Sequence, residues 1–230
     1  MKHLHTIRNF FLATHTGKAV FMALAAIMAA TTIAYAVQGR RGPKVTSISV
    51  ERALLEIGDS YGGGIVAYIL QPNESIGYIK ADGTAGTYTF SSTVQHGLIA
   101  ALEDESSTMA WIEGGSLQTT ALGGTGTELG DGAANTVKIL DASATGGAGK
   151  VCADKVDGGY SDWYLPSKDE LNKLYMLHSA GVGGFAGADY WSSSEAGGSL
   201  AWMQKFSYAI NSQKYDSKPY ALRVRAVRAF

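Results

Sequence analysis

The chain has 230 residues, of which 46% are hydrophobic and 17% charged, and its formal net charge is −1. This length and composition fit a folded chain of one or two domains and exclude a disordered one. The 29 glycines follow no three-residue period, which excludes collagen, and the single cysteine excludes an internal disulfide and a zinc site built from several thiolates.

Charge is distributed unevenly along the chain. The first fifty residues contain no acid and six basic residues, which are Lys2, Arg8, Lys18, Arg40, Arg41 and Lys44. From Glu51 onward there are 13 basic and 20 acidic residues, so this part has a net charge of −7. A generally basic surface is therefore excluded, and we expect no nucleic-acid partner.

The N-terminal segment is predicted to direct export. Residues 19–37 carry no charge and follow a basic leader, and Ala34-Tyr35-Ala36 has the small-x-small form that signal peptidase cleaves. Cleavage after Ala36 makes residues 1–36 a signal peptide. Without cleavage, residues 19–37 form a hydrophobic helix just long enough to anchor the chain in a membrane. A linker is then predicted at 37–56 and a domain at 57–230, and both interpretations place residues 45–230 outside the cytoplasm, secreted, periplasmic or at the cell surface.

Short apolar runs bounded by glycines predict strands in the first half of the domain. Ile65–Leu70 is typical of a buried strand, and further strands are predicted at Tyr88–Phe90 and His96–Ala101. Residues 103–133 are predicted to be mainly loop. Ala133–Ala142 has the apolar spacing of a helix.

The clearest helix signal follows Pro166. Ser167 and Glu170 have the spacing of a capping box, in which each side chain bonds the backbone of the other residue. Gly181 is predicted to end this helix. Strands are then predicted at Tyr190–Ser194, Ala201–Ile210 and Tyr220–Phe230, with Asn211–Ser217 as a hairpin loop between the last two. The pattern as a whole predicts an α+β fold with two short helices and an antiparallel sheet.

Six segments, taken in chain order, resemble one known family. They are Gly58–Val66, His96–Ala101, Asn135-Thr136, Gly159–Leu171, Tyr190–Glu195 and Arg223–Arg228. Over about residues 57–230 the chain resembles the DUF1566 family, the C-terminal domain of the Legionella collagen-like adhesin. The resemblance implies a C-type-lectin-like fold whose first and last strands pair, which puts Ile65–Leu70 beside Leu222–Phe230. The family's best-studied member is an adhesin for sulfated polysaccharides. This chain has no collagen-like stalk, so trimerisation through a stalk does not carry over.

Three patterns with a catalytic or cofactor interpretation fail on their details. Residues 145–151 lack the first glycine and the magnesium-binding hydroxyl of a phosphate loop, and residues 181–186 follow a helix where a dinucleotide fingerprint follows a strand. Cys152 has no local signature of a thiol nucleophile and is interpreted as a small buried residue. We therefore expect no catalytic residue, no cofactor and no enzyme activity.

Charged residues near the C-terminus allow two interpretations. Asp154, Asp157 and Asp162 lack the spacing of a calcium hand, so no metal site is assigned, and a structural calcium stays an open alternative.

The three arginines of the last predicted strand form either a stripe for polyanions or structural ion pairs with Asp162 or Glu195. These are Arg223, Arg225 and Arg228. We favour structural pairing with Asp162 or Glu195 over ligand binding.

The last predicted hairpin offers the best binding candidate. Aromatic rings beside amide and ammonium donors are a common way to hold sugars. The candidate ligand-binding residues are Trp202, Gln204, Tyr208, Asn211, Gln213, Lys214, Tyr215 and Lys218. Residues 201–230 also carry six basic residues against one acid, Asp216, which points to an anionic ligand. The competing interpretation is a set of core aromatics and solvated strand faces.

Together these observations predict a non-catalytic, adhesin-like module that binds glycans or sulfated and other anionic polysaccharides at a cell surface. The alternative is a structural or assembly subunit that binds protein partners or itself. Contact with a membrane is expected only through residues 19–37, and only if they are not cleaved.

Overall fold

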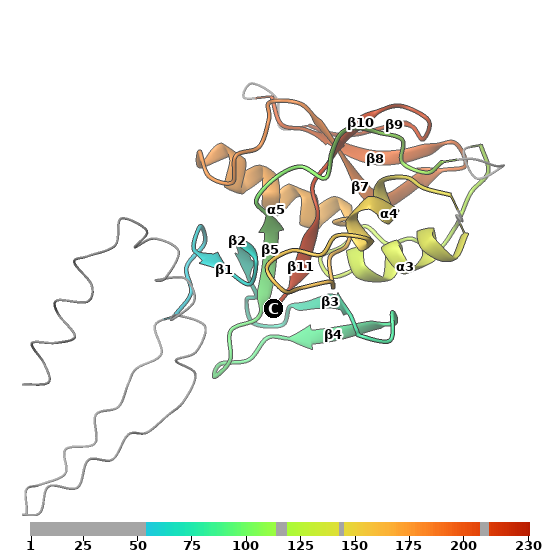
Figure 1. Cartoon of the computed structure of the whole chain (residues 1–230). Helices are drawn as coiled ribbons and strands as arrows, with labels where there is room; N and C mark the ends of the chain where they lie inside the picture. The colour runs from blue at the N-terminus through green and yellow to red at the C-terminus, as the bar shows by residue number, and fades with distance from the viewer. Residues whose placement is uncertain (1–53, 114–118, 143–144, 208–211) are drawn as a thin grey trace, which may run out of the picture. The chain divides into compact units, whose positions relative to one another are not determined.

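The structure is a computed structural model that describes residues 54–113, 119–142, 145–207 and 212–230 (Figure 1). The predicted signal peptide or anchor at 1–36 and most of the predicted linker lie outside these residues. Inside the described ranges, no helix has both the length and the apolar character needed to cross a bilayer.

An entirely apolar strand takes the centre of the first sheet. β5 (Gly97–Ala101) is buried along its whole length. β2 (Gly64–Ile69) and β11 (Val227–Ala229) pair with it in antiparallel fashion, one on each side. β1 (Ser60–Tyr61) adds a short edge strand beside β2. The strands predicted at Ile65–Leu70 and His96–Ala101 are therefore confirmed.

The predicted pairing of the first apolar strand with the last one is wrong. Ala100 of β5 faces Ile65 on one side and Val227 on the other. β5 therefore separates β2 from the C-terminal strand within the same sheet. The physical reason is the composition of β5, because a strand without polar side chains is better shielded in the centre of a sheet than at its edge.

The second sheet has five strands and consists mostly of an antiparallel meander. β7 (Asp189–Gly197) pairs with β8 (Leu200–Lys205), which pairs with the edge strand β9 (Ser212–Ser217). On the other side of β7, β10 (Leu222–Val224) runs parallel to it and then pairs with the second edge strand, β6 (Ser106–Met109).

Two segments predicted as loops contain these edge strands. The predicted hairpin loop Asn211–Ser217 is wrong over 212–217, which form β9, and the predicted loop at 103–133 contains β6. Edge strands have little buried surface, so their side chains are mostly polar and show no apolar alternation. The strand predicted over Tyr220–Phe230 divides into β10 and β11, which belong to different sheets.

A separate hairpin forms the third sheet. β3 (Ser75–Ile79) pairs with β4 (Ala85–Thr89), so the strand predicted at Tyr88–Phe90 begins earlier than expected. Tyr78 and Tyr88 stack across this hairpin with ring centroids 4.3 Å apart.

Three helices complete the described part of the chain. α3 (Gly132–Ala142) was predicted, whereas α4 (Ala148–Ala153) was not, so the expected number of two helices is wrong. α5 (Lys168–Ser179) begins at the predicted capping box and buries Leu171, Leu174 and Leu177 in the core beside the first sheet. α3 and α4 pack near β7, and α5 packs against β8 (Figure 1). The domain is therefore α+β, with mostly antiparallel sheets and three short helices, as the sequence predicted in outline.

Candidate functional site

The strand register places two predicted aromatic residues side by side. Trp202 of β8 pairs directly with Tyr215 of β9, so both rings lie on the same face of the second sheet. Their centroids are 5.7 Å apart and the ring planes meet at 87°. Trp202 is half-buried and Tyr215 is 57% exposed. The two rings form a right-angled aromatic corner at the edge of the sheet.

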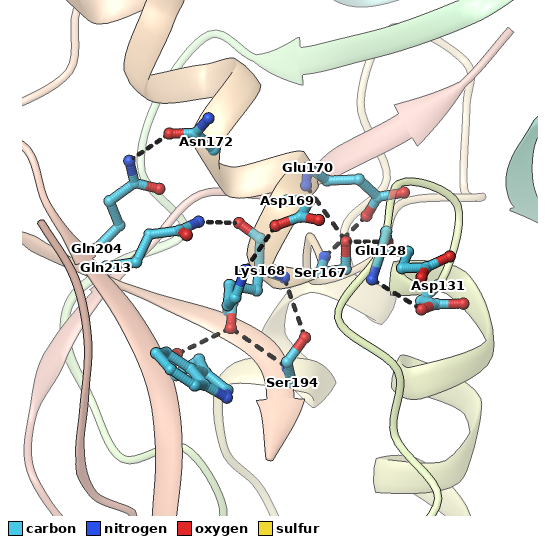
Figure 2. A network of polar contacts seen from close by, with 12 residues as sticks. Glu128, Asp131, Ser167, Lys168, Asp169, Glu170, Asn172, Ser194, Gln204 and Gln213 are labelled. Carbon is cyan, nitrogen blue, oxygen red and sulfur yellow. Dashed lines mark hydrogen bonds and ion pairs between the residues drawn. The ribbon is translucent and has the colours of Figure 1, made fainter. Parts of the chain in front are cut away.

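The beginning of α5 approaches the same face. The Lys168 ammonium lies 5.6 Å from the centroid of the Trp202 ring. Gln213, which is opposite Gln204 in the register, donates from Nε2 to the backbone oxygen of Lys168 at 2.8 Å (Figure 2). We call the four residues Lys168, Trp202, Gln213 and Tyr215 the Trp202 surface.

Lys168 was not among the predicted binding residues. Its sequence signal is that of the first turn of a helix, which says nothing about a ring 34 positions further along the chain. Only the packing of α5 against β8 brings its ammonium to Trp202.

The other predicted binding residues occupy different places. Gln204 is buried under α5 and donates from Nε2 to Asn172 at 2.8 Å (Figure 2). Lys214 is exposed but pairs with Met203, so its side chain leaves the opposite face of β9. Tyr208 and Asn211 lie outside the described residues.

Lys218 is inside the protein, so its interpretation as a ligand contact at the surface does not fit its position. Its side chain is 0% exposed, and its ammonium contacts Glu195 Oε1 at 2.5 Å and the backbone oxygen of Gly198 at 2.8 Å. It also donates to the backbone oxygen of Thr120 at 3.1 Å and lies 5.0 Å from the centroid of the Trp111 ring.

Glu195, the partner of Lys218, holds the start of the segment 119–131. Its carboxylate accepts hydrogen bonds from the backbone nitrogens of Leu122 at 2.7 Å and Gly123 at 2.8 Å. Burial by itself raises the pKa of Glu195, but the hydrogen bonds from Lys218 and these two nitrogens outweigh it, so the pKa lies below its usual value. Of the two carboxylates expected as alternative partners for the C-terminal arginines, Glu195 therefore pairs with a lysine instead.

The rest of the segment 119–131 is held by side chains from three elements. Asn135 of α3 bonds both the nitrogen and the oxygen of Gly126, each at 2.8 Å, and Ser194 of β7 donates to the same oxygen at 2.7 Å. Ser167, at the start of α5, donates to the backbone oxygen of Glu128 at 2.6 Å (Figure 2). This segment is fixed against α5 although it has no regular secondary structure.

Glu170 completes this connection from a fully buried position. Its carboxylate accepts from the backbone nitrogens of Ser167 at 2.8 Å and Gly130 at 3.0 Å. The Ser167 hydroxyl in turn accepts from the Glu170 nitrogen at 3.2 Å, which confirms the predicted capping box. Burial raises the pKa of Glu170 to about 7, against the lowering effect of the two backbone hydrogen bonds.

Arg223 of β10 and Arg225, which follows this strand, share one carboxylate that the sequence did not identify. Arg225 bonds Asp104 through Nε at 2.7 Å, and Arg223 bonds the same side chain at 2.8 Å. Arg225 is 1% exposed and donates further to the backbone oxygens of Ala101 and Gly183, each at 2.9 Å. Asp104 follows β5 in the chain and has no sequence feature that distinguishes it from the neighbouring acids.

Arg228 pairs with Asp162 as predicted. The contacts measure 2.7 Å from Nε and 2.9 Å from Nη2, so the guanidinium holds both carboxylate oxygens. Asp154 and Asp157, the other two acids considered for calcium, pair instead with Lys150 and Lys155. Within the described residues, no three His, Cys, Asp or Glu side chains gather in a way that could hold a metal.

Cys152 is buried, as the sequence predicted, and burial raises the pKa of its thiol. A thiol with a raised pKa is mostly protonated at neutral pH and is a poor nucleophile. This position fits a packing role for Cys152 in the core around Trp111 and Trp163.

No protein-family model and no curated protein matches the chain. Function is therefore inferred from the chemistry of the Trp202 surface. Its two rings offer apolar faces that suit the C–H groups of a sugar, and its amide and ammonium groups offer hydrogen-bond donors.

Proposed function

We propose that the domain at 57–230 is a non-catalytic, adhesin-like module that binds glycans at the Trp202 surface. The observation that carries this proposal is the aromatic corner, in which Tyr215 is 57% exposed and meets Trp202 at 87°. A single exposed ring such as that of Tyr220 is ordinary, but two rings that meet at a surface beside polar donors suit the recognition of a ligand with both apolar and polar groups.

Rigid support beneath the Trp202 surface strengthens the proposal. The start of α5 is held by the capping box and by the bonds from Ser167 and Glu170 to the segment 119–131. Gln213 is bonded to the backbone of α5, and Gln204 beneath it is bonded to Asn172. Because these groups are already ordered, a ligand does not have to order them on binding.

A C-type-lectin-like fold of the DUF1566 family is part of the proposal. It is supported by the α+β architecture and by the roles of residues inside the resembling segments, whereas the position of β5 between β2 and β11 departs from the pairing that the resemblance implies. Ser167 and Glu170 form a buried capping box, and Arg228 joins the last strand to Asp162. Arg228 and Asp162 lie far apart in the sequence, and contacts of this kind are expected of motifs that determine a fold.

We also propose that the domain works outside the cytoplasm. The support is the uncharged segment 19–37 after a basic leader, followed by the small-x-small sequence that ends at Ala36. N-terminal sequencing of the exported protein should find Val37 as the first residue. A first residue of Met1 would show that the segment is an uncleaved anchor.

The test of glycan binding is a glycan array probed with the full chain and with two single variants. Trp202→Ala should lose at least tenfold in affinity for the bound glycans, because it removes one wall of the aromatic corner. Tyr220→Ala is the matched control, since Tyr220 is 58% exposed but lies outside the Trp202 surface. Thermal melts of both variants show whether they are folded. Equal binding by the two variants, or no bound glycan, contradicts the proposal.

A second candidate is a structural subunit that assembles with copies of itself. It is favoured by the position of β9, which is an edge strand of the second sheet within the described residues. The exposed Lys214 on this strand opposes edge-to-edge pairing, as lysines on edge strands commonly do. Light scattering of the full chain distinguishes the two candidates, and a dimer that dissociates in a Gln213→Pro variant would favour assembly.

A further inference from the structure

We infer that the glycan bound at the Trp202 surface is uncharged, a neutral oligosaccharide chain without sulfate or carboxylate groups. This inference rests on the proposed function and concerns the class of its ligand. It reverses the expectation of a polyanion that the basic residues of 201–230 gave.

Most of these basic residues form ion pairs with acidic side chains. Five of the six have a carboxylate partner within 3.1 Å. The pairs are Lys205 with Asp189, Lys218 with Glu195, Arg223 and Arg225 with Asp104, and Arg228 with Asp162. Four carboxylates from elsewhere in the chain therefore neutralise most of the positive charge that seemed to mark a surface for polyanions, with Arg223 and Arg225 sharing Asp104.

The sixth basic residue, Lys214, points away from the Trp202 surface. Side chains alternate between the two faces of a strand. Because Lys214 lies between Gln213 and Tyr215, its ammonium leaves the face opposite to theirs. It also has a neighbour of opposite charge on that face, Asp216, two positions along β9.

The ammonium of Lys168, which does reach the Trp202 surface, is also balanced. It lies 2.7 Å from Asp169 Oδ1, and the Asp169 side chain is 43% exposed (Figure 2). A sulfate group near Lys168 would therefore meet the Asp169 carboxylate as well. Because the two charges of this pair cancel, it offers a sulfate group no net attraction.

The same carboxylate suits a neutral sugar. Hydroxyl groups of sugars donate hydrogen bonds, and an ionised carboxylate is a strong acceptor for them. Sulfate and carboxylate groups of a polyanion have no proton to donate at neutral pH. A surface with two rings, an amide and a balanced ammonium–carboxylate pair therefore selects hydroxyl-rich, uncharged ligands.

The experiment compares matched neutral and charged polymers. The full chain is titrated with dextran and dextran sulfate, and with glucose, mannose, galactose and N-acetylglucosamine oligosaccharides and their sulfated forms, at 50 and 500 mM NaCl. The variants are Tyr215→Ala, which changes an exposed residue and so spares the fold, and Tyr220→Ala as its control.

Neutral glycans should bind with a Kd that changes less than twofold between the two salt concentrations, since stacking is not screened. Tyr215→Ala should weaken this binding at least tenfold, and Tyr220→Ala should leave it unchanged. Binding only to sulfated forms, weakened tenfold by salt and by Tyr215→Ala, would overturn the neutral ligand and leave the proposed function standing. Binding of neither class, or binding that Tyr215→Ala does not change, would overturn both.

Discussion

Two neighbouring regions of the molecule reverse the usual placement of residues. Around the start of α5 and the segment 119–131, charged side chains such as Glu170 and Lys218 are fully buried. On the adjacent β8–β9 face, Trp202 and Tyr215 keep their rings at the surface. The buried charges all have specific partners in the backbone or in other side chains, whereas the rings do not fill the core. The first region therefore stabilises the fold, whereas the second leaves two aromatic rings accessible to solvent.

The largest effect is expected from breaking a buried ion pair at the C-terminal strands. Arg225→Ala removes the hydrogen bonds to Asp104 and to four backbone oxygens, so it should lower the free energy of unfolding by roughly 3–5 kcal/mol. Arg223→Ala is the matched control, because Arg223 bonds the same carboxylate but is 33% exposed and should lose less than about 1 kcal/mol. Denaturant unfolding measures both. Equal losses of stability in the two variants would show that the burial of Arg225 does not make its ion pair more important for folding than that of Arg223.

The next effect is a pH dependence that Glu170 gives to folding. Its pKa rises from 4.5 in the unfolded chain to about 7 in the folded one, so the folded state binds the proton more tightly. This contribution to stability is fully present below pH 4.5 and is lost as the pH rises through 7. The loss should be on the order of 3 kcal/mol.

Glu170→Gln should remove this part of the pH dependence while lowering stability at acid pH, since an amide cannot accept from both Ser167 and Gly130. The test is the free energy of unfolding of the wild type and of the Glu170→Gln variant, measured between pH 4.5 and 8 and compared at each pH. Burial also raises the pKa of Glu105, so Glu105→Gln is the control for a buried acid elsewhere. A parallel pH profile of wild type and Glu170→Gln would refute the assignment.

A smaller effect is expected at the cap of α5. Ser167→Ala removes the acceptor for the Glu170 nitrogen and the donor to Glu128, and should lower stability by about 1–2 kcal/mol. Aspartate usually replaces serine well at a helix cap, but Ser167 is 0% exposed and its hydroxyl donates to a carbonyl that a carboxylate would repel. Ser167→Asp should therefore be worse than Ser167→Ala in thermal melts. A neutral Ser167→Asp would show that the hydroxyl acts only as a cap.

The smallest effect concerns the lysine that remains at the edge of the second sheet. Lys214→Ala should change glycan affinity less than twofold and leave the melting temperature unchanged, because Lys214 is on the opposite face from Tyr215. Isothermal titration of the variant and the wild type measures this. A loss of tenfold or more would move the binding surface to the other face of β9.

Local contacts of this fold could be read from the sequence, and contacts between distant segments could not. The capping box of Ser167 and Glu170 spans three residues, so its spacing alone predicted it. The strands around Ile65 and His96 were predicted from their apolar runs, but their order in the sheet depends on which strand is most completely buried. β9 was missed because an edge strand with polar side chains shows no apolar pattern.

The candidate site shows the same contrast between local features, which could be predicted, and contacts between distant segments, which could not. Trp202 and Tyr215 could be found because aromatic rings beside amides and lysines stand out in a short segment. The burial of Lys218 could not, since it depends on Glu195 and on the backbone of Thr120, 98 positions away. Lys168 was missed because its role depends on how α5 packs on β8. The charge of a segment therefore predicts a ligand poorly until the ion pairs are known.

The tryptophan side chains offer the most direct test of the proposed binding surface. The chain has four tryptophans. Trp111, Trp163 and Trp191 are fully buried, with their indole N–H groups bonded to backbone oxygens at 2.7, 3.3 and 2.9 Å, and Trp202 is half-buried on the surface. The indole N–H signals of the protein can be followed by NMR during titration with a bound glycan, and Trp202→Phe assigns its signal. Glycan binding at the Trp202 surface should shift the Trp202 signal while the other three stay in place. A stationary Trp202 signal with a bound glycan would contradict it.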